Sequence, residues 1–242
     1  MLRRTAAAPP AVLWKHIAPA ARDTSSACEC ALIRLRDDIL SGQLAPGAKI
    51  VIRDLIDSYQ IGVTPLRDAL AQLVGSGLVL REAQRGFQVA PVSREDLRDV
   101  TRSRKLVELA AFELSLQNID DAWIKRATAA HRAFCEASRG VGDDRPISKD
   151  WEERHRAFHF ALLSGCESPT LYSLCAHLHD RFDRYRRLAL PTRSFMGAVD
   201  QDHEVLLDAA LAGRTAEAIA VLGQHIDDTH AVIAQCFAAA QH

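Results

Sequence analysis

The 242-residue sequence lacks a long apolar run and an excess of charge of either sign. No stretch approaches the roughly 20 apolar residues that a membrane span needs. Hydrophobic residues make up 48% and charged residues 25% of the chain, as in folded soluble proteins. We therefore expect one or two compact domains, no membrane contact and a cytoplasmic location.

The N-terminal end lacks the continuous apolar core of a secretion signal. It holds three arginines and a stretch rich in proline and alanine, including Pro9, Pro10 and Pro19. These features predict a flexible N-terminal tail over residues 1–24.

Cysteine motifs and a basic excess are absent as well. The six cysteines include no CxxC pair, so free thiols are expected rather than disulfides or a cysteine metal site. The net charge is −1, and residues 25–92 contain seven basic and seven acidic side chains. A DNA-binding prediction must therefore depend on where the arginines lie.

Residues 25–92 combine three short helical patterns with one hairpin pattern. Apolar spacing and flanking turn residues predict helices over 28–40, 52–59 and 64–74. Two β-type runs follow, over 78–81 and 87–90, around a turn that ends in Gly86. This order of elements predicts a winged helix-turn-helix DNA-binding domain.

The chain from Ser93 onward shows long helical periods and no strand pattern. Breakers such as Asn118, Pro169 and Gly213 separate six predicted helices, near 94–118, 120–138, 148–164, 168–189, 195–212 and 214–239. Residues 93–242 should form an all-α antiparallel helical bundle. The fold prediction is thus a mainly α protein with an N-terminal winged helix-turn-helix domain and a C-terminal bundle.

Several candidate DNA contacts lie at the helix starts and the wing. In a helix-turn-helix, the second helix enters the major groove, where each base pair shows a distinct pattern. Thr64 and Arg67 lie in the first turns of that helix, and Arg53 begins the preceding one. Arg85 and Gly86 lie at the wing tip, which can reach a minor groove. Each arginine alone could be a solvated surface residue, but their joint placement favours DNA contact.

The stretch from Ile39 to Val92 resembles the DNA-binding domain of GntR-family regulators nearly end to end. Its motifs are a PG turn, an arginine-led helix, a TPxRxAL helix, a GL(V/I) strand entry and an RG(F/Y) wing, here Pro46-Gly47, Arg53, Thr64–Leu70, Gly77–Val79 and Arg85–Phe87. The resemblance implies a homodimer that binds a palindromic operator in double-stranded DNA, with Arg53, Thr64, Arg67, Arg85 and Gly86 at the DNA.

Two residues depart from that family pattern. Val63 stands where many members have an arginine, and Gly62 replaces the usual serine or threonine at the helix start. The glycine removes a side-chain cap. Both differences concern which operator bases are contacted and leave the prediction of DNA binding unchanged.

Four of the ten histidines fall on apolar faces of predicted bundle helices: His155 and His159 within 148–164, His203 within 195–212, and His225 within 214–239. Each one could be a hydrogen-bonded core histidine. Together they could instead hold one divalent metal, and nitrogen ligands favour Zn²⁺ or Ni²⁺. His177 and His179 lie off the apolar stripe of their helix, so we expect both on the surface.

The bundle resembles the FCD ligand-binding domain of the same family. In that domain an Asp-x-x-x-His pair and two later histidines bind a metal, and His159, His203 and His225 match the three histidines. His155 stands where the family has Asp or Asn. Arg104 and Glu108 match a family R-x-x-x-E pair. The resemblance makes Arg104 a candidate ligand for a small carboxylate effector; the alternative is a surface ion pair with Glu108.

The combined prediction is a DNA-binding transcriptional repressor. A small organic acid, bound near a divalent metal in the bundle, controls its affinity for the operator. An enzyme is one alternative, since Glu152-x-x-His155 resembles half of a di-iron motif, with Asp200-x-x-His203 as its nearest second half. No H-E-x-x-H protease motif occurs. A DNA-binding protein that senses no ligand is the other alternative.

Overall fold

The computed structural model describes residues 26–82, 86–138, 147–189 and 197–239. The predicted tail, residues 1–24, and the wing residue Arg85 lie outside these ranges. All six cysteines lie within them, and none of the six forms a disulfide. In the described part of the chain, no helix is long and apolar enough to cross a membrane.

The N-terminal part has the predicted order of helices and strands. Its elements are α1 (Ala27–Leu40), β1 (Lys49–Ile50), α2 (Ile52–Tyr59), α3 (Val63–Gly75), β2 (Val79–Glu82) and β3 (Gly86–Val89). The strands form an antiparallel sheet in the order β1-β3-β2, and Lys49 pairs with Gln88 while Val79 pairs with Val89. The sequence prediction missed β1, because two residues are too few to show an alternating pattern.

Local sequence explains where these helices begin. The Ser26 hydroxyl caps α1 by accepting a hydrogen bond from the Glu29 amide. Gly62 occupies the N-cap position before α3 and provides no side-chain cap, as expected, and Pro65 lies in the first turn of the helix. One face of each helix is buried in a first hydrophobic core, whose fully buried members include Leu35, Ile39, Leu66, Leu70 and Val89.

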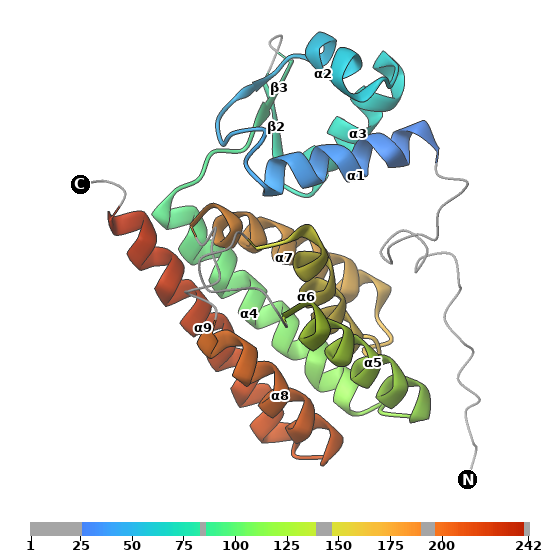
Figure 1. Cartoon of the computed structure of the whole chain (residues 1–242), viewed down its shortest axis with the longest axis vertical. Coiled ribbons are helices and arrows are strands. Elements are labelled where there is room, and N and C mark those ends of the chain that lie inside the picture. Colours follow the sequence, from blue (N-terminus) through green and yellow to red (C-terminus); the bar gives the residue numbers. More distant parts are fainter. Residues whose placement is uncertain (1–25, 83–85, 139–146, 190–196, 240–242) are drawn as a thin grey trace.

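The C-terminal part is all helical. It consists of α4 (Arg94–Leu116), α5 (Asp121–Ser138), α6 (Lys149–Leu162), α7 (Pro169–Ala189), α8 (Gly197–Leu211) and α9 (Thr215–Ala239). Each helix falls within about two residues of a predicted one, within the usual uncertainty of helix ends. Helix α4 packs against α7 and α9, α5 packs against α6, and α8 packs against α9 (Figure 1). A second hydrophobic core lies between these helices. The mainly α fold prediction is confirmed.

The two parts meet where α1 lies along α7 (Figure 1). Arg36 of α1 donates two hydrogen bonds, of 2.7 and 2.6 Å, to the Asp180 carboxylate of α7. Arg156 of α6 also donates to that carboxylate. Gly42 follows α1 with a φ of 81°, and a side chain there would meet Leu188 of α7 at 2.9 Å. Polar contacts and a close backbone approach thus join the N-terminal part, which we call the DNA-binding head, to the helical bundle.

Candidate functional site

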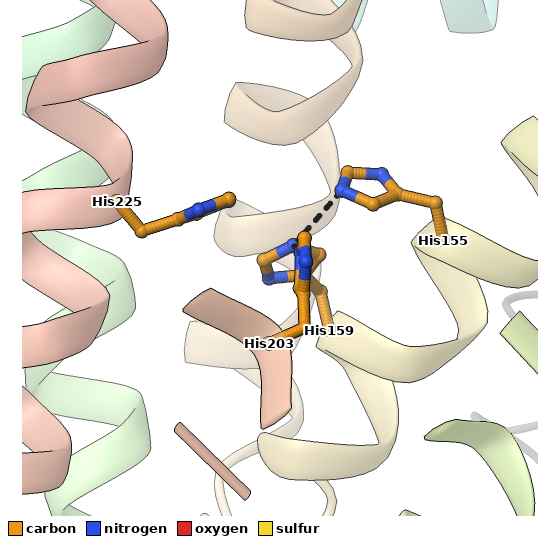
Figure 2. A group of neighbouring side chains, drawn as sticks. All are labelled: His155, His159, His203 and His225. Atoms are coloured by element: carbon orange, nitrogen blue, oxygen red, sulfur yellow. Dashed lines mark hydrogen bonds between the residues drawn. The ribbon is translucent and has the colours of Figure 1, made fainter. Parts of the chain in front are cut away.

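Four buried histidines from three helices meet inside the bundle. His155 and His159 lie one turn apart on α6, His203 comes from α8 and His225 from α9. Figure 2 shows their rings turned toward a common centre. All four side chains are at most 5% exposed. The structure therefore brings together every histidine that the sequence analysis assigned to a metal.

The spacing of the ring nitrogens suits a metal ion. The Nε2 atom of His159 lies 3.3 Å from Nε2 of His155 and 3.2 Å from Nε2 of His203. All four candidate ligand atoms lie within 4.8 Å of one another. Two nitrogens bound to a tetrahedral metal at 2.0–2.1 Å are about 3.3 Å apart. The closest contacts in the cluster have this length.

Hydrogen bonding alone does not satisfy these rings. Within the described residues, the buried Nδ1 atoms of His155, His159 and His225 have no hydrogen-bond partner. Nε2 of His159 faces two other Nε2 atoms, yet a neutral ring nitrogen can serve only one of them as donor or acceptor. A cation at the centre would be bound by one ring nitrogen of each histidine and would resolve the conflict among the facing Nε2 atoms, so the donor set fits a divalent metal.

Burial also keeps the rings in the form that binds metals. Desolvation lowers the pKa of His155 and of His159 well below the usual value, and the neighbouring histidines lower both further. Both imidazoles are therefore neutral near pH 7. A neutral imidazole offers its lone pair without competition from a proton.

Two carboxylates stand behind the cluster. Oε1 of Glu108 lies 3.7 Å from Nδ1 of His159, and Oδ2 of Asp202 lies 3.6 Å from Nδ1 of His225. These distances are longer than a hydrogen bond, but each carboxylate lies at the outer nitrogen of its ring, where such a group orients a histidine that binds a metal. Sequence analysis missed this role for both residues, because only the tertiary fold brings them to these rings.

The candidate DNA surface consists of exposed residues on α2, α3 and β3. Arg53 on α2 and Thr64 and Arg67 on α3 are exposed, while the opposite side of α3 is buried in the first core. Gly86 is exposed at the start of β3, with a φ of 95° that favours glycine. The structure leaves these residues open to solvent, and Arg85 lies outside the described residues.

Comparison with known proteins places both parts of the chain. Residues 31–89 match the bacterial regulatory proteins of the gntR family, and residues 99–228 match the FCD domain. The chain is 35% identical over 211 residues to the HTH-type transcriptional regulator BphR of Paraburkholderia xenovorans (strain LB400), covering 87% of this chain and 86% of that protein. It is 33% identical over 214 residues to the HTH-type transcriptional repressor GlaR of Escherichia coli (strain K12), covering 84% and 94%.

The chain belongs to the GntR family of transcriptional regulators.

The solved structure of E. coli McbR/YncC matches this GntR regulator with a TM-score of 0.76 at 19% identity, covering 88% of this chain and all of that one (100%). At this identity the likeness shows the fold alone. The families and relatives are regulators of transcription and not enzymes. The Glu-x-x-His alternative also finds no support, because the Glu152 carboxylate accepts from Arg186. The side chain of Asp200 lies outside the described residues.

Arg104 of this GntR regulator is buried, with 4% of its surface exposed, and so is Glu108, with 2%. Its Nε donates to Glu108 at 2.6 Å, and its guanidinium lies 4.7 Å from the centre of the Phe182 ring. The alternative of a surface ion pair is therefore wrong. Arg104 and Glu108 form a buried ion pair, and the Glu108 carboxylate also faces His159, so the pair adjoins the histidine cluster.

His179 corrects a second expectation. Its side chain is only 2% exposed, and its ring centre lies 5.7 Å from that of His159. Desolvation lowers the pKa of His179 well below the usual value, and the positive charge of Arg104 is the second cause of this shift. His177 is exposed, as expected. The prediction failed because α7 buries a polar face: Asp180, Asp183, Arg184 and Arg186 are also buried, so apolar spacing did not mark the inner side.

Proposed function

We propose that this GntR regulator is a cytoplasmic, effector-controlled repressor. Residues 25–92 bind a palindromic operator as part of a homodimer, with Arg53, Thr64, Arg67, Arg85 and Gly86 at the DNA. Residues 93–242 bind a divalent metal through His155, His159, His203 and His225, and a small carboxylate effector beside it. The convergence of the four buried imidazoles is the observation that carries this proposal. The relative GlaR, a transcriptional repressor, supports the assignment as a repressor.

The charge at the cluster supports an anionic effector. Imidazole ligands are neutral, so four of them leave both positive charges of a divalent ion uncompensated. The nearby Glu108 carboxylate is already paired with Arg104. A buried uncompensated charge is costly, and a carboxylate would lower that cost. A bound ion would supply a Lewis-acid centre for this carboxylate, and nitrogen ligation favours Zn²⁺ or Ni²⁺.

A chain of contacts leads from the cluster to the DNA-binding head. Arg156 directly follows His155 on α6 and donates to Asp180 of α7. The same carboxylate holds Arg36 of α1. A small shift of α6 on effector binding would therefore move Asp180 and change the position of α1 against α7. Coupling of this kind requires that the effector bind one arrangement of the head better than another.

Metal analysis of purified protein tests the first half of the proposal. We expect about one divalent metal per chain by elemental analysis, and a higher unfolding temperature on adding Zn²⁺ or Ni²⁺ to stripped protein. His203→Ala should abolish both effects, and His177→Ala, which removes an exposed histidine, should change neither. No metal and no thermal shift in the wild type would refute the site.

Gel retardation tests the second half. Metal-loaded protein should retard DNA from the region upstream of its own gene, and a panel of small carboxylic acids should contain one that releases it. A regulator without a sensed ligand would bind DNA equally in the presence of every acid in the panel.

A further inference from the structure

A single exposed valine begins the helix that we assign to the major groove. Val63 is the first residue of α3, and its side chain is 45% exposed. Ile61, two residues earlier, packs against the first core, and Leu66 is fully buried in it. The core therefore takes its apolar contacts from these neighbours, and folding does not explain an apolar side chain at position 63.

The residue before it leaves this side chain accessible. Gly62 has a φ of −67°, which any residue can adopt. A Cβ at this position would have no heavy atom nearer than Cδ of Pro65, at 4.0 Å. Glycine is thus not required by the backbone, and its effect is to leave the start of α3 uncovered. Val63, the Thr64 side chain and bare backbone are presented there together.

An isopropyl group can recognise only one feature of the major groove. It neither donates nor accepts a hydrogen bond, so it cannot read the polar pattern of the base edges. Thymine alone presents a methyl group there, and apolar side chains recognise it by contact. The first residues of a recognition helix are those that reach base edges. We propose that Val63 selects a thymine by contact with its 5-methyl group at one position of each half-site.

The size of the effect follows from the contact. This inference rests on the proposed docking of α3 in the major groove. Removing one methyl-sized apolar contact weakens binding about fourfold per half-site, and about 15-fold for two half-sites of a dimer. Effects of that size are measurable by titration.

The test begins with selection of operators from a random duplex library by the full-length protein. Each thymine of the selected half-site is then replaced, symmetrically, by deoxyuridine, which lacks only the methyl group. We expect one position at which this change weakens binding about 15-fold. For Val63→Ala, which removes both γ-methyl groups, the effect of deoxyuridine at that position should be much smaller. Because Val63 is exposed, the variant should unfold at the wild-type temperature.

Thr64→Ser is the matched control, because Thr64 is the neighbouring exposed residue that has a methyl group. This variant should keep the full sensitivity to deoxyuridine. The inference is overturned if no position responds in the wild type, if Val63→Ala keeps the response, or if Thr64→Ser abolishes it. In those cases specific operator binding would still support the proposed function, whereas failure to select any operator would overturn both.

Discussion

The contact of Asp180 with two arginines predicts a large effect for Asp180→Asn. The Asp180 carboxylate accepts three hydrogen bonds, two from Arg36 and one from Arg156. Its side chain is 9% exposed, and those of the arginines are 23% and 20% exposed. Breaking a fully buried ion pair by removing one partner costs about 3–5 kcal/mol. Because these arginines can regain some water, we expect a loss of about 2–3 kcal/mol.

The pH dependence of this contribution has a definite sign. Burial alone would raise the pKa of Asp180, but Arg156 and Arg36 outweigh it and hold the pKa below its usual value. The contribution is then fully present above the unfolded-state pKa, about 3.9. It is lost as the pH falls further, through the folded-state pKa. Asp180→Asn should thus destabilise at pH 7 and have much less effect in strong acid.

Urea unfolding followed by tryptophan fluorescence measures this change, since Trp123 and Trp151 lie buried in the bundle. A cycle with Arg36→Met tests the pair itself: the second substitution should cost at least about 1 kcal/mol less once the first is present. Asp150→Asn, in an exposed pair with Arg154, is the control and should change nothing measurable. Fully additive effects of Asp180→Asn and Arg36→Met would refute the idea that this contact joins head and bundle.

Three further predictions concern the cluster of four histidines and the candidate DNA surface. His155→Asp should keep the metal, as measured by elemental analysis. It should weaken binding of the carboxylate effector about tenfold or more, because the set of metal ligands gains a negative charge. An unchanged effector affinity by calorimetry would contradict this prediction. Glu108→Gln should lower metal affinity about 10- to 100-fold in a competition with a chelator, as loss of a carboxylate behind a ligand does; an unchanged affinity would remove Glu108 from the site. Arg67→Ala should weaken operator binding by about 1–3 kcal/mol, and it would leave affinity and salt dependence unaltered only if α3 is not the recognition helix.

The sequence predicts this fold well where periodicity and breakers agree. Glycine, proline and asparagine separate long amphipathic segments, so all six bundle helices could be located. The burial and convergence of His155, His159, His203 and His225 could be predicted for the same reason: each lies on an apolar stripe, and apolar stripes face the interior. Strand β1 gave no such signal because it has two residues.

The remaining errors share a physical cause. His179 was predicted to lie on the surface, and a surface ion pair was the alternative for Arg104, because polar side chains are normally exposed. Here both are buried against other helices: the Arg104 guanidinium, paired with Glu108 on its own helix, lies against Phe182 of α7, and the His179 ring lies near that of His159 on α6. A pattern of apolar residues cannot reveal a buried face built from charges. Pairings across helices depend on tertiary structure, which one helix does not encode.

The charged inner face of α7 is itself an argument about function. Burying ion pairs is often less favourable than packing apolar side chains of similar volume, so stability does not account for this face. Its groups connect different parts of the regulator instead. Asp180 holds α1 and α6, and Arg184 donates to the carbonyls of Ala90 and Pro91 in the segment that leads into the bundle. Directional contacts of this kind fix the N-terminal part relative to α6, the helix that bears two of the four clustered histidines. A regulator that transmits binding at those histidines to its DNA contacts needs such a connection, and an apolar face would not provide one.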